Sequence, residues 1–207
     1  MKKMFLASSF ADVANLFEKF AGEECSGKTV TFIPTASLNE EVTFYVGAGK
    51  ESLEKLGLVV DELEVSTSTK EEIENKLKSN DYIYVTGGNT FFLLQELKRT
   101  GADRFIIEQI NLGKKYIGES AGSIVLSRNI KYTKDMDDCT AAPNIGSFSS
   151  LGVIEFYPVP HHTNFPFKES VERIISDYGN ELDLCPISNK QAIVVSGNKY
   201  EVWSSET

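Results

Sequence analysis

The residues from Gly118 to Gly122 read Gly-Glu-Ser-Ala-Gly and fit the pattern G-x-S-x-G. This pattern is typical of a sharp turn that lifts a serine hydroxyl clear of the end of a strand. Residues 115–117 before it predict a short buried strand, and residues 123–127 after it predict the start of a helix. Ser120 is therefore a candidate nucleophile. The alternative is a Gly/Ser-rich loop that matches the pattern by chance.

A nucleophilic serine needs a general base, and the chain has only two histidines, His161 and His162. Both follow a predicted strand at 154–159, and such sites assemble where parallel strands end at the carboxyl edge of a sheet. We favour His161, because it comes directly after Pro160, where the backbone is stiff. The alternative is a pair of ordinary loop histidines.

The acid that would orient this histidine is less defined by the residues. Asp135, Asp137 and Asp138 all lie between the serine and the histidines, and Glu119 precedes the serine. A residue adjacent to the nucleophile rarely reaches the far nitrogen of its base. The residues alone therefore leave the acid as one of the three aspartates.

Two backbone N–H groups are expected to stabilise the oxyanion of an acyl-transfer reaction. The amide of Ala121, directly after the serine, is the first candidate. The second is Gly88, in the glycine turn Thr86–Thr90 that follows another predicted strand. The alternative for this turn is an ordinary strand-to-helix connection with Asn89 as the helix cap.

The elements that must position these residues alternate along all 207 residues. This β-α alternation predicts one domain, residues 1–207, with a mostly parallel sheet covered by helices on both faces. Residues 129–152 are polar and predict a long loop over the active face. The predicted strands are 4–6, 29–33, 58–65, 82–85, 115–117, 154–159 and a terminal hairpin of 191–196 and 199–203. The predicted helices are 10–20, 40–56, 70–78, 89–99, 103–112 and 167–178.

Composition narrows the classes of function. A net charge of −9 disfavours nucleic-acid binding, which needs a basic surface. The three cysteines are far apart and in no metal-binding spacing, which favours free thiols in a reducing compartment. No apolar run approaches a membrane span, and we interpret the apolar N-terminus as a first strand rather than a signal peptide. We expect a cytoplasmic protein with no membrane partner.

One motif in the sequence is a decoy. Residues 22–29 match the phosphate-binding pattern G-x-x-x-x-G-K-[ST]. A phosphate loop needs a strand before it and a helix after it, and here the predicted order is reversed. We therefore do not predict nucleotide binding.

Four segments, in order along most of the chain, resemble the peptidase E (α-aspartyl dipeptidase) family of serine peptidases, which is related to cyanophycinase. Residues 86–91 resemble the glycine turn of that family, and residues 116–122 resemble its nucleophile strand and turn. Residues 130–136 resemble the segment that carries its acid, and residues 160–164 the segment that carries its base.

The resemblance implies a flavodoxin-like or class I glutamine-amidotransferase-like fold in three layers, with a Ser-His-Asp triad. It assigns Ser120 as nucleophile, His161 as base and Asp135 as the preferred acid. It assigns Gly88 and Ala121 to the oxyanion hole. It implies no metal and no cofactor.

Three departures from the family concern the substrate. Glu119 stands where relatives often carry a bulky aromatic residue, and we consider it as a ligand for a substrate ammonium. Lys168 is the nearest basic residue to the position that supports aspartyl specificity, although it lacks the bidentate geometry of arginine. Asn89, which is not one of these departures, is a further candidate for substrate contact. Residues 186–191 lack the acidic residue that many relatives carry.

The sequence thus favours a serine-type hydrolase of short peptides, dipeptidase-like, with aspartyl specificity open. The alternative is a binding or regulatory protein on a retired hydrolase fold. An amidotransferase is a weaker option, since it normally carries a cysteine where this chain has Ser120. We expect a short peptide as the substrate, and we leave open whether the chain forms a homodimer.

Overall fold

The computed structural model describes residues 1–205, with a central sheet of seven strands. The strand order is β3-β2-β4-β5-β1-β8-β9. Strands β1 to β5 pair in parallel, whereas β8 pairs antiparallel with β1 and with β9. The bounds are β1 (Lys3–Ala7), β2 (Thr29–Ile33), β3 (Val59–Glu62), β4 (Tyr82–Val85), β5 (Lys115–Glu119), β8 (Gln191–Ser196) and β9 (Lys199–Ser204).

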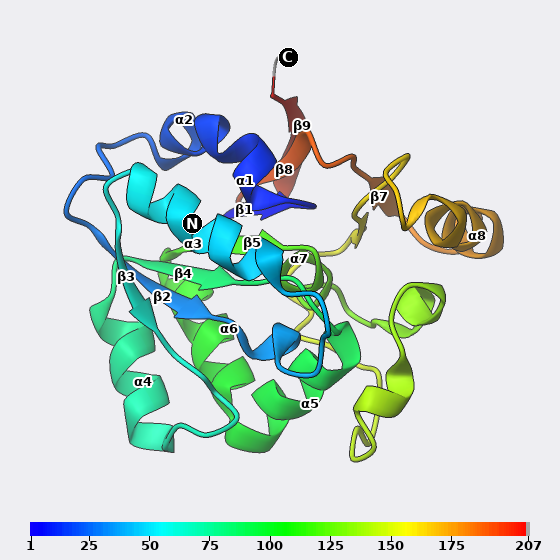
Figure 1. Cartoon of the computed structure of the whole chain (residues 1–207), viewed down its shortest axis with the longest axis horizontal. Helices are drawn as coiled ribbons and strands as arrows, with labels where there is room; N and C mark the ends of the chain where they lie inside the picture. Colours follow the sequence, from blue (N-terminus) through cyan, green and yellow to red (C-terminus); the bar gives the residue numbers. More distant parts are fainter. Residues whose placement is uncertain (206–207) are drawn as a thin grey trace.

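Helices cover both faces of this sheet, as Figure 1 shows. One face carries α1 (Phe10–Val13), α2 (Phe17–Ala21) and α3 (Phe44–Lys55). The other carries α4 (Lys70–Ser79), α5 (Thr90–Thr100) and α6 (Ala102–Leu112). The predicted α/β architecture is confirmed. Among residues 1–205, no helix is both long and apolar enough to cross a membrane.

The side chains of β1 explain why both faces must be covered. Met4 and Leu6 belong to one buried hydrophobic cluster, and Phe5 and Ala7 to the other. Alternate residues of a strand point to opposite faces, so an apolar strand of this kind needs a layer of helices on each side. Strands β3-β2-β4-β5 follow the 2-1-3-4 order of flavodoxin-like sheets, and β1 takes the next position.

The structure departs most from the predicted elements in two places. The helix predicted over residues 10–20 is broken into α1, a 3-10 turn at Ala14–Leu16, and α2. The strand predicted over 154–159 is shorter, β6 (Tyr157–Val159), and pairs in parallel with an unpredicted strand, β7 (Leu184–Pro186), outside the main sheet. Helix α8 (Lys168–Tyr178) connects these two strands.

The turn after β5 is packed so tightly that only glycine fits at two of its positions. A Cβ atom on Gly118 would lie 2.6 Å from the carbonyl oxygen of Gly122. A Cβ atom on Gly122 would lie 2.2 Å from the carbonyl oxygen of Val85, in β4. The short helix α7 (Ala121–Ile124) can therefore lie directly against the sheet.

Glu119, the last residue of β5, is a buried carboxyl group that joins the sheet to a helix. It is only 2% exposed. Its Oε1 accepts the Phe10 N–H of α1 at 2.9 Å, and its Oε2 accepts the Tyr84 hydroxyl of β4 at 2.9 Å. Burial outweighs these bonds and raises the pKa of Glu119 from 4.5 to about 7.

The glycine packing predicts that Gly122→Ala destabilises the protein. The added methyl group would collide with the Val85 carbonyl. We therefore expect the free energy of unfolding to fall by about 1–3 kcal/mol or more. Gly47→Ala is the control, because this helical glycine has nothing within 4 Å of an added Cβ. Urea denaturation measures both variants. Wild-type stability in Gly122→Ala would contradict this account of the turn.

The buried carboxyl group predicts a pH-dependent stability. Because the pKa of Glu119 is higher in the folded chain, its contribution is greatest below pH 4.5 and is lost as the pH rises through 7. The side chain of residue 119 in Glu119→Gln is neutral at every pH. The free energy of unfolding of this variant should therefore decline less than that of wild type between pH 5 and 8, by on the order of 2–3 kcal/mol. Glu54→Gln, exposed on α3, is the control. Parallel pH profiles for wild type and Glu119→Gln would refute the prediction.

Candidate active site

Ser120 occupies a backbone conformation that residues other than glycine rarely adopt. Its φ is 47° and its ψ is −106°. Its N–H donates to the Ala7 carbonyl at 2.9 Å, and its own carbonyl accepts the Ser123 N–H at 2.8 Å. Strained residues of this kind persist only where the surroundings fix them, and they cluster at functional sites. The result is a serine side chain held at the carboxyl end of β5.

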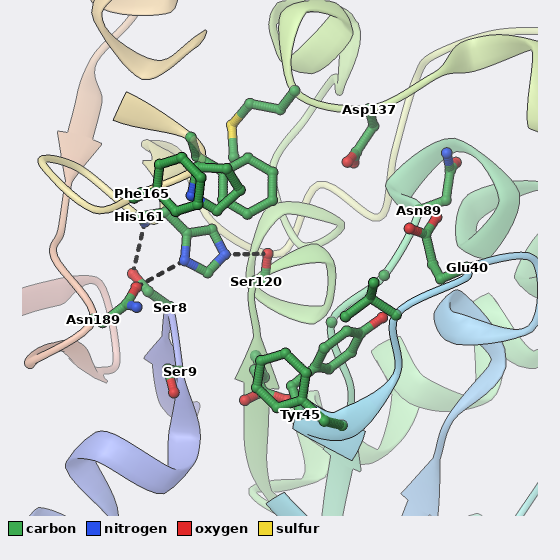
Figure 2. A pocket seen from close by; sticks show the side chains of 18 of the residues that line it. Ser8, Ser9, Glu40, Tyr45, Asn89, Ser120, Asp137, His161, Phe165 and Asn189 are labelled. Atoms are coloured by element: carbon green, nitrogen blue, oxygen red, sulfur yellow. Dashed lines mark hydrogen bonds between the residues drawn. The ribbon is translucent and has the colours of Figure 1, made fainter. Parts of the chain in front are cut away.

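His161 faces Ser120 in the structure. Its Nε2 lies 3.0 Å from the Ser120 Oγ, as Figure 2 shows. Its backbone N–H donates to the Ser8 Oγ at 3.0 Å, and its ring stacks on Phe167 with the centroids 4.7 Å apart. His162 lies 3.6 Å from Glu172 instead. The structure thus brings together the predicted serine and the histidine that we favoured.

The other ring nitrogen of His161 contacts an asparagine. Nδ1 lies 2.8 Å from the Oδ1 of Asn189, whose own N–H donates to the Asn164 Oδ1 at 2.9 Å. The two-stranded sheet explains this contact. Val159 of β6 pairs with Pro186 of β7 in parallel, so the segments after both strands leave in the same direction. Asn189 therefore comes beside His161.

The prediction that Asp135 orients His161 is wrong for this structure. Asp135 is exposed and faces the Arg173 Nε at 3.9 Å. The two alternatives are also used elsewhere. Asp137 accepts the Thr90 N–H at 3.0 Å, and Asp138 accepts the Thr140 N–H at 2.8 Å.

Asn189 is the residue that sequence reasoning missed. Because strand β7 was not predicted, nothing in the predicted topology placed residue 189 beside His161. One signal was available, because residues 186–191 lack an acid that many relatives carry. A polar residue in that segment was therefore the natural replacement.

The two predicted oxyanion amides belong to tight turns beside Ser120. Gly88 has a φ of 129°, and a Cβ there would lie 2.2 Å from the Ala36 carbonyl oxygen. An added Cβ on the neighbouring Gly87 would lie 3.3 Å from the Ser120 Cβ. Within residues 1–205, the N–H groups of Gly88 and Ala121 donate to no other group. Both amides therefore remain candidates for the oxyanion hole.

Helix α7 has only four residues, which limits its macrodipole. We expected a longer helix to begin behind Ser120, but in the structure α7 offers little more than the N–H groups of a first turn. Any electrostatic stabilisation here must come from individual N–H groups.

A pocket of about 520 Å³ opens at this place. Ser120 and His161 line it together with aromatic and acidic side chains. The acidic lining residues are Asp12, Glu40, Glu119, Asp137 and Asp138, and the large apolar ones are Val42, Phe44, Tyr45, Met136, Phe165 and Phe167. No lysine or arginine of the described chain lines it.

The three tentative substrate residues have other roles in the structure. Both carboxylate oxygens of Glu119 bond to internal groups. Asn89 caps α5, since its Oδ1 accepts the Phe92 N–H at 2.9 Å and its Nδ2 donates to the Asp138 carbonyl at 2.9 Å. Lys168 is exposed and does not line the pocket. Glu119 and Asn89 still line the pocket, so their contact with a substrate stays a prediction.

Burial shapes the titration of the pocket. It raises the pKa of Asp137 to about 6, and it also raises the pKa of Glu40. For His161 burial lowers the pKa, against an opposing effect of the Asn189 hydrogen bond. Burial therefore favours the neutral form of the imidazole. Among the described residues, no group of three or more His, Cys, Asp or Glu side chains is placed to hold a metal ion.

Two relatives are similar to the chain over almost its full length. An uncharacterized peptidase of Listeria monocytogenes is 54% identical over 199 residues, which cover 96% of this chain and 97% of that protein. An uncharacterized peptidase of Pasteurella multocida is 53% identical over 196 residues, covering 95% and 94%. Peptidase E of Shewanella amazonensis is more distant, with 34% identity over 65% of this chain and 54% of its own length.

Solved structures agree with the fold. A Listeria monocytogenes protein provisionally named peptidase E superposes with a TM-score of 0.95 and 52% identity, with both chains fully covered. A peptidase from an acI-B1 actinobacterium, at 24% identity, shares the fold with a TM-score of 0.71 over 99% of this chain and 88% of its own. The sequence matches the family described as Peptidase family S51 over residues 4–203. The chain therefore belongs to peptidase family S51, a family of serine peptidases.

Proposed function

We propose that this chain is a serine peptidase that hydrolyses short peptides, dipeptides among them, through an acyl-enzyme on Ser120. The observation that carries the proposal is the 3.0 Å contact between the Ser120 Oγ and the His161 Nε2, at a strained turn that lines a pocket. A serine hydroxyl is a weak nucleophile until an adjacent base accepts its proton. A pocket of about 520 Å³ suits a substrate of a few residues.

The reaction follows from these contacts. The Ser120 Oγ attacks the peptide carbonyl carbon while its proton passes to the His161 Nε2. The tetrahedral intermediate collapses to an ester on Ser120, the C–N bond breaks, and His161 gives the proton to the leaving amine. Water, deprotonated by His161, then cleaves the ester and regenerates the serine.

Asn189 determines which ring nitrogen of His161 carries the proton. An amide oxygen can only accept a hydrogen bond, so the Nδ1 that faces the Asn189 Oδ1 carries the proton. The Nε2 lone pair then points at the Ser120 hydroxyl, as a base requires. Cys-His-Asn sites use the same arrangement with a thiol nucleophile. Unlike a carboxylate, the neutral amide adds no charge that would stabilise the imidazolium.

The free N–H groups of Gly88 and Ala121 are the oxyanion donors of this proposal. Loss of one such donor typically costs about 10²–10³ in turnover number. Their amides lie on turns that only unusual backbone geometry permits, which makes them preorganised.

A binding or regulatory role on a retired hydrolase fold is the second candidate. The neutral Asn189 in the place of an acid is the observation that favours it. A serine that has lost activation would not react with a fluorophosphonate, whereas an activated serine would.

Replacing the nucleophile tests the proposal. We expect Ser120→Ala to lower dipeptide turnover by several orders of magnitude while the melting temperature stays near that of wild type. A fluorophosphonate probe should label the wild-type chain at Ser120 and leave Ser120→Ala unlabelled, as intact mass spectrometry would show. An unlabelled wild type without peptidase activity would favour the retired fold.

Adding a carboxylate beside His161 tests the role of Asn189. In Asn189→Asp the new charge faces Nδ1–H, so the pKa of His161 should rise above its depressed wild-type value. The chain has only two histidines, so NMR can follow both imidazoles, and His162 is the internal control. Equal movement of both, or of neither, would show that Asn189 does not orient His161.

A further inference from the structure

Ser120 divides the pocket into two sides of different chemistry. Figure 2 shows His161 on one side of Ser120, and Glu40 and Asp137 on the other. In the proposed mechanism His161 protonates the leaving amine, so the leaving residue lies on the histidine side. The acyl residue of the substrate must then face the opposite side, which we name the acyl subsite.

Two of the residues at the leaving side are Phe165 and Phe167. Phe167 stacks on the His161 ring, and Phe165 is 94% exposed at the pocket lining. Neither aromatic ring carries a formal charge. This side suits an apolar leaving residue such as leucine.

The acyl subsite is acidic and contains a free hydroxyl group. Glu40, Asp137 and the Tyr45 ring line it. The Tyr45 hydroxyl oxygen is buried, and it has no hydrogen-bond partner among residues 1–205. A buried polar atom without a partner carries a cost that a bound ligand can remove. The hydroxyl is thus a second, independent indication that a polar ligand belongs here.

The charged groups that face this hydroxyl are acidic. Burial, followed by the negative charges of Glu40, Glu119 and Asp137, raises the pKa of Tyr45. Desolvation raises the pKa of Asp137 and also that of Glu40, an exposed residue at the rim of the same pocket. No lysine or arginine of the described chain lines the pocket. A substrate cation would supply the missing positive charge.

We propose that the acyl subsite binds the cationic side chain of a lysine or arginine residue, between Glu40, Asp137 and the Tyr45 hydroxyl. This inference deepens the proposed peptidase function and rests on it. The same subsite disfavours an aspartyl residue, because a substrate carboxylate would meet like charges with no basic side chain to pair with.

A matched pair of dipeptides isolates the side-chain charge. Lys-Leu and norleucyl-Leu have side chains of similar length, and both carry an α-ammonium, so they differ at the side-chain end alone. A hydrogen bond to a charged group is worth about 1.5–3 kcal/mol, which converts to about 10–150-fold. We expect kcat/KM for Lys-Leu to exceed that for norleucyl-Leu by this factor, and Asp-Leu to be the poorest substrate.

Two charge-neutralising variants locate the effect. Asp137→Asn and Glu40→Gln should each reduce the Lys-Leu to norleucyl-Leu preference by about threefold or more, and the double variant should reduce it further. Each amide keeps an oxygen that can accept a hydrogen bond, including the one from the Thr90 N–H. Glu54→Gln lies outside the pocket and should retain the wild-type preference. Melting temperatures check that all variants fold.

Binding to Ser120→Ala separates this inference from the proposed function. Calorimetry with Lys-Leu, norleucyl-Leu and Asp-Leu measures the preference without turnover. Fluorophosphonate labelling of wild type together with equal Lys-Leu and norleucyl-Leu parameters would overturn the cationic subsite and leave the peptidase intact. Absence of labelling and turnover, with Lys-Leu still bound preferentially, would support the subsite and overturn the peptidase. A preference unchanged in the double variant would also overturn this assignment.

Discussion

The close approach of helix α7 to strand β4 is the constraint on which the site depends. The Cα atom of Gly122 lies so near the Val85 carbonyl that no side chain fits between them. This packing forces the chain to reverse within one residue, and Ser120 absorbs the reversal at a positive φ. The N–H of Ser120 bonds to Ala7 in β1, so two neighbouring strands fix the turn. The central sheet thus holds Ser120 in its strained backbone conformation.

A second, smaller sheet supplies the partner of this serine. Strands β6 and β7 run in parallel outside the main sheet, and the segments that leave them carry His161 and Asn189. Ser8, at the end of β1, links the two sheets: its Oγ accepts the His161 N–H at 3.0 Å and donates to the Ile187 carbonyl at 3.1 Å. Ser8 thus holds the backbone of His161 beside the end of β1, next to the turn that carries Ser120.

Local patterns in the sequence predicted the parts of the site that depend on local geometry. The glycine spacing around Ser120 reflects short-range sterics, and alternating apolar segments reflect the layers of the fold. Asn189 was not predictable in this way, because its contact with His161 depends on a three-residue strand paired across 27 positions of sequence. Asp135 was preferred through family resemblance, yet its segment packs against α8, where Arg173 faces it. The structural role of Glu119 was not predictable either, because nothing in the neighbouring sequence shows that Phe10 and Tyr84 donate hydrogen bonds to its carboxylate.

The amide at position 189 is consistent with the charge of the pocket. Five carboxyl groups already line this space with no lysine or arginine of residues 1–205 beside them, and burial raises the pKa of Glu40, Glu119 and Asp137. A further carboxylate at the histidine would add to the same field and would have to be desolvated there. Asn189 orients the ring by a hydrogen bond without adding that charge. An amide at this position stabilises the protonated imidazole less than a carboxylate would, and burial of His161 lowers the pKa of the ring in the same direction.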